Sequence, residues 1–265
     1  MSDLRLVSCL GENTYPVCSL LADYLTEQLQ QPLHFASDLP WTDACEQLPA
    51  GEIKLGWLCG LLYSLQQDER ACYQLLGKPV FRGQTSASYH AYVVVHRDSP
   101  CQSLADLDGQ RLVINDPDSY SGNHVLWAQL ATLEQAPRFA SVQESGRHSN
   151  SMRSVATGAA DVAVIDHTVF DYWHTTADKD FAAIMAQLRV LEAIGHAPAP
   201  PLVAHRSLDA ATVAAIQQAL WRLDNSSWQS AFAAAGLERV VAAADADYNV
   251  LREAYRRSLS HNTRR

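Results

Sequence analysis

The sequence lacks the features that mark several large classes of protein. No window approaches the roughly 20 apolar residues that a membrane-spanning helix needs. Its 20 basic residues are outnumbered by 29 acidic ones, for a formal charge of -9, so we expect no nucleic-acid or anionic-membrane partner. The N-terminus shows no basic stretch followed by an apolar one. The chain as given therefore predicts a cytoplasmic location, or a periplasmic one if a signal peptide has been removed.

Common motifs of metal and nucleophile chemistry are missing as well. The six cysteines form no C-x-x-C pair, and the ten histidines form no H-E-x-x-H. Ser121, His148 and Asp166 occur in the order of a hydrolase triad, but no G-x-S-x-G elbow surrounds Ser121. We therefore expect no metal, no cofactor and no catalytic residue. A serine hydrolase is kept as the weaker alternative.

What the sequence does contain is a repeated alternation of strand and helix patterns. An apolar strand pattern at 4–10 is followed by a polar turn and an amphipathic helix pattern at about 17–30. The alternation recurs at the strand 53–58, and it starts again at 113 and runs to the strand 162–165. Strands that alternate with helices predict an α/β fold with mainly parallel sheets.

Two strand patterns divide the chain. The patterns at 92–96 and 189–194 bracket a self-contained run, so we expect one lobe of residues 1–90 with 197–265 and another of residues 91–196. Residues 69–91 are expected to be mostly loop, and the tail from 256 a solvated helix end that frays. The other expected elements are helices at 61–68, 103–109, 123–134, 150–157, 209–223 and 227–235, strands at 141–144 and 202–204, and a proline linker at 198–201.

A turn crowded with short polar side chains separates the strand pattern that ends at 114 from the helix pattern that starts near 123. We call residues 115–122 the polar turn. A strand that feeds through such a turn into a helix presents unpaired N–H groups and the positive end of the helix dipole, which favours an anion. The simpler interpretation is an ordinary helix cap by Asp118 or Ser119. Three uncharged hydroxyl donors stand in this turn: Ser119, Tyr120 and Ser121.

Several segments, taken in their order along the chain, resemble the phosphate, phosphite and phosphonate solute-binding proteins of ABC transporters. The likeness spans nearly the whole chain. It rests on residues 50–63, 99–111, 116–122, 146–166 and 245–248. The resemblance implies the type 2 periplasmic binding fold, a two-lobed clamp with a hinge, in which a ligand is closed into the cleft between the lobes and no reaction is catalysed.

The resemblance also implies a set of ligand-binding residues. By position these are Tyr63, Tyr89, Ser119, Tyr120, Ser121, His148 and Asp166. Tyr120 stands where the family usually has threonine, so a ring would replace a small hydroxyl beside the anion. The implied ligand is a small oxyanion such as a phosphonate, phosphite or phosphate, and the implied partner is an ABC transporter permease. We expect a monomer.

Simpler interpretations stay open for these residues. Tyr63 and Tyr89 are also typical of packing at an edge, His148 of an exposed neighbour of a helix cap, and Asp166 of a cap itself. The same fold also suits a cytosolic sensor or accessory protein that binds a different small ligand. The sequence thus predicts a binding clamp and leaves its ligand open.

Overall fold

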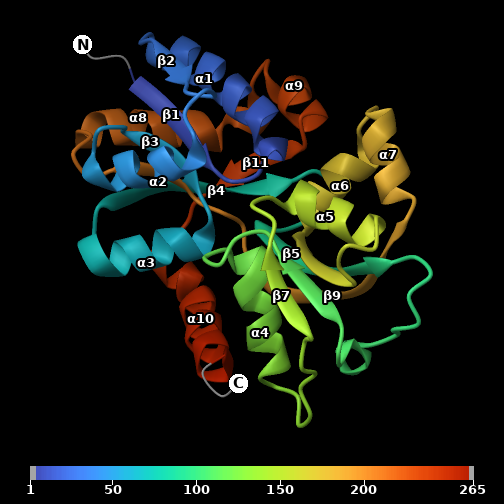
Figure 1. Cartoon of the computed structure of the whole chain (residues 1–265). Helices are drawn as coiled ribbons and strands as arrows, with labels where there is room; N and C mark the ends of the chain where they lie inside the picture. Colours follow the sequence, from blue (N-terminus) through green and yellow to red (C-terminus); the bar gives the residue numbers. More distant parts are fainter. Residues whose placement is uncertain (1–3, 263–265) are drawn as a thin grey trace. The chain divides into compact units, whose positions relative to one another are not determined.

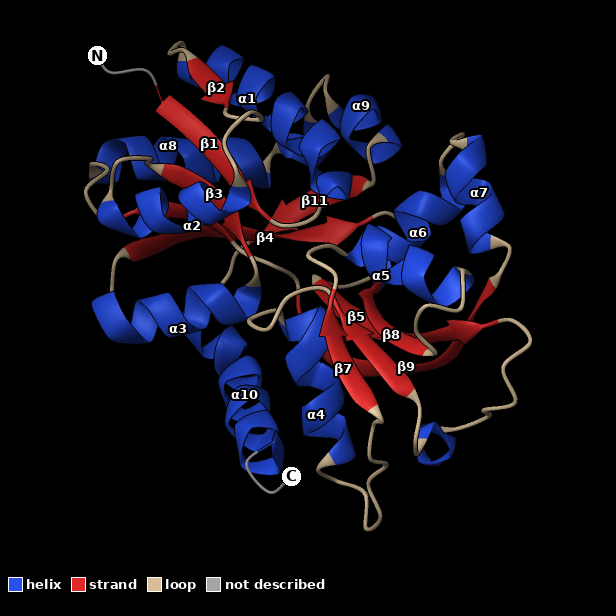
Figure 2. Ribbon diagram, in the orientation of Figure 1, coloured by secondary structure: helices blue, strands red, loops and turns tan. Residues whose placement is uncertain are grey.

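The structure, a computed structural model, describes residues 4–262 (Figure 1). These residues form two compact units, one made of residues 4–88 with 198–249 and the other of residues 89–197 with 250–262. Each unit contains its own sheet with helices packed against it (Figure 2). In the described part of the chain no helix has the length and apolar character to cross a membrane.

The first unit is built on a six-stranded sheet in the order β11-β4-β10-β3-β1-β2. Strand β1 pairs in parallel with both β2 and β3, while β10 runs antiparallel to β3 and β4, and β11 antiparallel to β4. The strands are β1 (Leu4–Cys9), β2 (Leu33–Phe35), β3 (Leu55–Leu58), β4 (Tyr73–Phe81), β10 (Leu202–His205) and β11 (Leu237–Val241).

The helices of the first unit bury an apolar core against this sheet. Leu21, Ile216 and Phe232, from three different helices, pack in one cluster with Trp57 of β3. The indole N–H of Trp57 donates to the Pro200 carbonyl at 2.9 Å, so this ring is a core residue. The helices are η1 (Glu12–Thr14), α1 (Tyr15–Leu29), α2 (Trp41–Ala50), α3 (Gly60–Arg70), α8 (Ala210–Trp221), η4 (Leu223–Asn225), α9 (Gln229–Ala234) and η5 (Asp245–Tyr248).

The second unit is built on a five-stranded sheet in the order β7-β6-β8-β5-β9. Strand β6 pairs in parallel with β7 and β8, and β5 runs antiparallel to β8. The strands are β5 (Ser88–His96), β6 (Arg111–Ile114), β7 (Ser141–Glu144), β8 (Val162–Asp166) and β9 (Leu188–Pro198). The expected α/β class with two separate sheets is confirmed, and both sheets combine parallel with antiparallel pairs.

The helices of the second unit include the last one of the described chain. Helix α10 buries Leu251, Ala254 and Ser258 along one side, and the Ser258 hydroxyl lies 2.8 Å from Nδ1 of His124. Residues 250–262 therefore group with the second unit, whereas the sequence assigned the whole segment 197–265 to the first. The helices are η2 (Leu104–Leu107), η3 (Tyr120–His124), α4 (Val125–Leu130), α5 (His148–Ala156), α6 (His167–Thr175), α7 (Lys179–Met185) and α10 (Asn249–Asn262).

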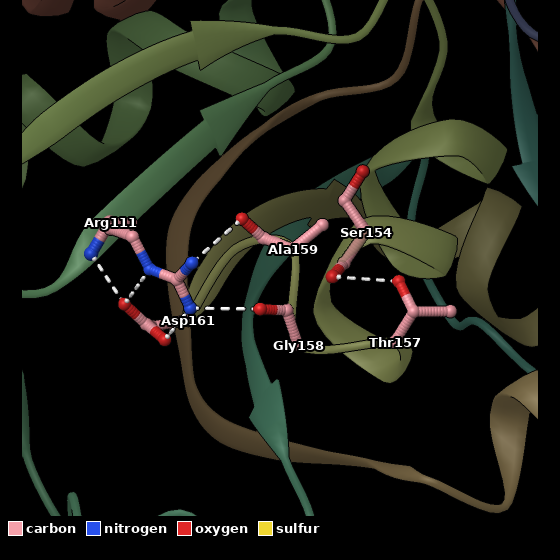
Figure 3. A network of polar contacts seen from close by, with 6 residues as sticks. All are labelled: Arg111, Ser154, Thr157, Gly158, Ala159 and Asp161. Carbon is pink, nitrogen blue, oxygen red and sulfur yellow. Dashed lines mark hydrogen bonds and ion pairs between the residues drawn. The ribbon is translucent and has the colours of Figure 1, made fainter.

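An ion pair ties the start of β6 to the start of β8. The Arg111 guanidinium donates to both carboxylate oxygens of Asp161, at 2.8 and 2.7 Å, and also to the carbonyls of Gly158 and Ala159 (Figure 3). The hydrogen bonds from Arg111 hold the pKa of the Asp161 carboxyl below its usual range. These contacts fix the register in which Leu112 lies beside Val162, and the register positions the other ends of both strands.

Three segments differ from the elements expected from the sequence. Residues 73–81 form β4 where a loop was expected. Gly77 and Pro79, two residue types that are uncommon in strands, interrupt the apolar pattern there. Residues 167–185 form α6 and α7, and residues 237–241 form β11, none of which was expected. Residues 73–81 and 237–241 become strands because they pair with strands that are distant in sequence. Strand β4 lies between β10 on one side and β11 on the other.

Candidate functional site

The polar turn is held in shape by its own short side chains. Asp116 accepts from the Asp118 N–H at 2.7 Å, and the Ser119 hydroxyl oxygen accepts from the Gly122 N–H at 3.1 Å. The Asn123 amide donates to the Pro117 carbonyl at 2.6 Å. Ser119 is therefore the helix cap that the simpler interpretation predicts. A hydroxyl that accepts at its oxygen still has its own hydrogen to donate, so the cap role leaves Ser119 available to an anion.

The helix that follows the turn begins as a π-helix. The His124 N–H donates to the Ser119 carbonyl at 3.1 Å, five residues back, and η3 then passes into α4. Single π turns of this kind are rare and are frequent at functional sites. The start of any helix leaves N–H groups without an intrahelical acceptor. Ser121, in this first turn, is buried, and its hydroxyl makes no hydrogen bond within the described residues.

Gly122 lets two further side chains reach the polar turn. A Cβ at this position would lie 1.6 Å from Oδ1 of Asn115 and 2.9 Å from Cε1 of His148. Both side chains therefore occupy space that any other residue at position 122 would fill. Oδ1 of Asn115 and Nδ1 of His148 are enclosed, and neither has a hydrogen-bond partner within the described residues. The chain thus brings the side chains of Asn115 and His148 to Gly122, next to Ser121, with enclosed polar atoms at two of these positions.

His148 opens α5 and is neutral at pH 7. Burial lowers the pKa of its imidazole, and the charge of Asp166 and a hydrogen bond to the backbone of Val164 raise it by less. Asp166 ends β8 and caps α6, because one of its oxygens accepts from both the N–H and the hydroxyl of Thr168, at 2.8 and 2.7 Å. The cap interpretation of Asp166 is confirmed, and the same carboxylate acts electrostatically on His148.

Tyr120 packs in the interior of the second unit. Its ring lies 6.1 Å from that of Tyr89 and is almost wholly buried, and its hydroxyl would lie 3.2 Å from a Cβ at Gly195 of β9. Gly195 leaves room for the Tyr120 hydroxyl in the interior of the second unit, and the position of the ring relative to a bound anion stays a prediction. What Tyr120 and Tyr89 contribute to binding stays a prediction.

Tyr63 belongs to the first unit. Its hydroxyl donates to the Asp245 carboxylate at 2.9 Å, and its ring packs edge-on against Tyr248 at 5.0 Å. The other residues predicted for the site lie in the second unit. A ligand-binding role for Tyr63 stays a prediction.

The geometry does not favour a serine hydrolase. The described residues contain no hydrogen bond between Ser121 and His148, and Asp166 is engaged by Thr168. No group of three or more His, Cys, Asp or Glu side chains in that part of the chain could hold a metal ion. Sequence reasoning missed Asn115 and Gly122. Both residues lie inside the polar turn, so the sequence did point to the segment that holds them. Their individual importance depends on the contacts of Asn115 and His148 at Gly122, which the sequence does not show.

A comparison with models of protein families identifies one family. A family model described as ABC transporter, phosphonate, periplasmic substrate-binding protein matches residues 12–248. Among curated proteins, none matches the sequence.

Solved structures share the fold at low sequence identity. A binding protein component of an ABC phosphonate transporter from Pseudomonas aeruginosa has a TM-score of 0.80 at 15% identity, covering 98% of this chain and 87% of its own. PhnD1 from Prochlorococcus marinus, in complex with methylphosphonate, has a TM-score of 0.79 at 16% identity over 97% and 98% of the two chains. A Xanthomonas citri protein bound to ATP has a TM-score of 0.74 at 16% identity over 99% of each chain.

Proposed function

We infer the function from a premise that the family match establishes: this chain belongs to the phosphonate family of periplasmic substrate-binding proteins of ABC transporters. Proteins of this class bind a solute and catalyse no reaction. We propose that the ligand is a small oxyanion, a phosphonate, phosphite or phosphate, and that the polar turn binds it. Delivery of the ligand to an ABC transporter permease is part of the same proposal.

One observation carries the proposal: Ser121 lies at a helix start, and its hydroxyl forms no hydrogen bond with any other described residue. Its Oγ is not among the enclosed side-chain atoms that lack a partner, so this hydroxyl is open to a partner that arrives from outside. An oxyanion supplies several acceptors at once, and each charge-assisted hydrogen bond to it contributes about 1.5 to 3 kcal/mol. Local N–H and O–H groups can therefore bind an anion although the chain is net negative.

Calorimetry tests the proposal with methylphosphonate, phosphite and phosphate as ligands. Replacing Ser119→Ala and Ser121→Ala together should weaken binding by about 3 kcal/mol, at about 1.5 for each hydroxyl, which is more than about a hundredfold in affinity. Ser154→Ala is the matched control, because the Ser154 hydroxyl on α5 already donates to the Asn150 carbonyl at 3.0 Å. Its affinity should equal that of the unaltered protein.

Thermal unfolding separates binding from folding in the same variants. Loss of the Ser119 cap should cost about 1 kcal/mol of stability, much less than the loss in affinity. Unchanged affinity in the double variant would mean that the turn only caps a helix. Hydrolysis of a phosphate or carboxylate ester that disappears in Ser121→Ala would instead favour the hydrolase.

A further inference from the structure

A serine, a histidine and a lysine of the first unit meet in the turn between β10 and α8. The Ser207 hydroxyl lies 2.8 Å from Nδ1 of His205, the last residue of β10. Nζ of Lys54, just before β3, donates to Oγ of Ser207 at 2.7 Å and to the Gly51 carbonyl at 2.6 Å. Ser207 is exposed, so a reagent in solution can reach it, whereas His205 is buried.

The hydrogen-bond pattern indicates which atom of the serine and histidine pair holds the hydrogen. The Ser207 N–H donates to His205 Nδ1 at 3.2 Å, so Nδ1 is an acceptor. The ring also hydrogen-bonds to the backbone of Pro49, which offers only a carbonyl, so Nε2 carries the hydrogen of the ring. The Ser207 hydroxyl therefore donates to Nδ1, as a nucleophile does to its base.

His205 is held in place and is neutral at pH 7. Gly51 has a φ of +76°, and a Cβ there would lie 2.6 Å from Cε1 of His205, so the ring packs directly on the glycine backbone. Burial, together with the charges of Lys54 and Arg206, lowers the pKa of the imidazole, and the hydrogen bond to Pro49 raises it by less. A neutral imidazole that a third group orients can accept a proton from a hydroxyl.

A hydroxyl that donates to a neutral imidazole and accepts from an ammonium group is activated as a nucleophile. We propose that Ser207 is a site of covalent acylation, which takes the acyl group of an activated ester with His205 as its base. A bond forms between Oγ and the carbonyl carbon, and the bond from that carbon to the leaving oxygen breaks. The hydroxyl proton passes to Nδ1 and from there to the leaving group. The Lys54 ammonium stabilises the negative charge that develops on Oγ.

Acetylation by para-nitrophenyl acetate at about pH 7 tests the proposal on the intact protein. Release of nitrophenolate gives the rate, and mass spectrometry of a digest locates the acetyl group. We expect Ser207 to be acetylated at least about a hundredfold faster than Ser86. Ser86 is the matched serine, because it is exposed in the same unit and its hydroxyl lies 2.9 Å from that of Ser88 in place of an imidazole. Ser207→Ala should abolish the fast release.

Two variants test the partners of Ser207. His205→Gln removes the base and should slow acetylation about a hundredfold, and Lys54→Met should slow it about tenfold. The control is His34→Gln, at an exposed histidine of β2, which should leave the rate unchanged. Thermal unfolding shows whether each variant is folded, since His205 packs against Gly51. The comparison of Ser207 with Ser86 in the unaltered protein needs no variant and stays decisive if one does not fold.

Three results would contradict the proposal. Equal acetylation of Ser207 and Ser86 would show that the turn gives its serine no special reactivity. Acetylation of the Lys54 amine in place of Ser207 would overturn the serine as the nucleophile, and hydroxylamine distinguishes the two because it cleaves an ester and leaves an amide. An unchanged rate in a folded His205→Gln would overturn the base. None of these residues belongs to the polar turn, so each result leaves the proposed function unaffected.

Discussion

In the first unit, β1 leads through a tight turn and η1 into α1; in the second unit, β6 leads through the polar turn and η3 into α4. Each of these strands has a parallel neighbour on both sides. The first turn closes on itself: the hydroxyls of Ser8 and Thr14 lie 2.8 Å apart, and that of Thr14 donates to the Gly11 carbonyl at 2.8 Å. In the polar turn the Ser121 hydroxyl has no such partner among the described residues.

The difference shows how one local pattern serves two purposes. Both turns place hydroxyls between a buried strand and a helix start, and the sequence alone would make either one a candidate for binding an anion. In the first turn the hydroxyls hydrogen-bond within the turn, so the turn serves to connect the strand to the helix. In the polar turn the Ser121 hydroxyl has no partner among the described residues and is not an enclosed atom, so it can donate to a ligand.

The strongest way to break this comparison is Gly122→Ala. The new methyl group would fall 1.6 Å from Asn115 Oδ1 and 2.9 Å from His148 Cε1, which displaces both side chains and fills the space between them. We expect methylphosphonate affinity to fall about a thousandfold. Stability should change little, since the displaced atoms are the ends of side chains and alanine favours a helix. Calorimetry and thermal unfolding measure the two quantities, and unaltered affinity would place the binding site elsewhere.

Tyr120→Thr tests whether the Tyr120 ring stabilises the interior of the second unit or crowds the ligand. Because the ring packs on Tyr89 and is nearly fully buried, its removal should leave a cavity that lowers the free energy of unfolding by about 3 kcal/mol. A denaturant titration measures this loss. Tighter binding of methylphosphonate at full stability would show instead that the ring crowds the anion.

Ser8→Ala tests the turn of the first unit in the same way as Ser121→Ala tests the polar turn. It removes the partner of Thr14 and leaves the Leu10 N–H, which donates to Ser8 at 3.2 Å, without its acceptor. The free energy of unfolding should fall by about 1 to 2 kcal/mol with no change in affinity. Ser121→Ala should give the opposite pattern, a loss of affinity at nearly full stability. The same pattern in both variants would remove the distinction between the two turns.

The last prediction concerns acid and a stack of histidines in the second unit. The His90 ring stacks on His167 at 4.1 Å, and burial, with the charges of His167 and His196, lowers the pKa of His90 to about 4. The unfolded chain takes up this proton near pH 6.5 and the folded one only near pH 4, so stability is lost as the pH falls between about 6.5 and about 4.

Denaturant midpoints across this pH range measure the effect. His90→Gln should flatten the pH dependence. The control is His34→Gln, which changes an exposed histidine of β2 and should leave the dependence as it is. A slope that is identical in the unaltered protein and in His90→Gln would contradict this account of the stack.

The fold was largely predictable because its signals are local. Alternating apolar strands and amphipathic helices gave the two α/β units, and the order of motifs gave the family, which the match over residues 12–248 confirms. Strands β4 and β11 were not predictable, because their neighbours in the sheet come from distant parts of the chain. The grouping of α10 with the second unit depends likewise on its contact with His124.

The sequence by itself determined where the polar turn lies and which donors it holds, since strand, turn and helix follow one another along the chain. Only the tertiary structure decided which polar atoms stay unpaired. The parallel pairing of β6 with β8 aligns the two strands, Asn115 and His148 both reach the Gly122 position, and Gly195 leaves room for the Tyr120 hydroxyl in the interior. Hydrogen-bond satisfaction and packing are properties of contacts between residues far apart in sequence, so no local pattern could encode them.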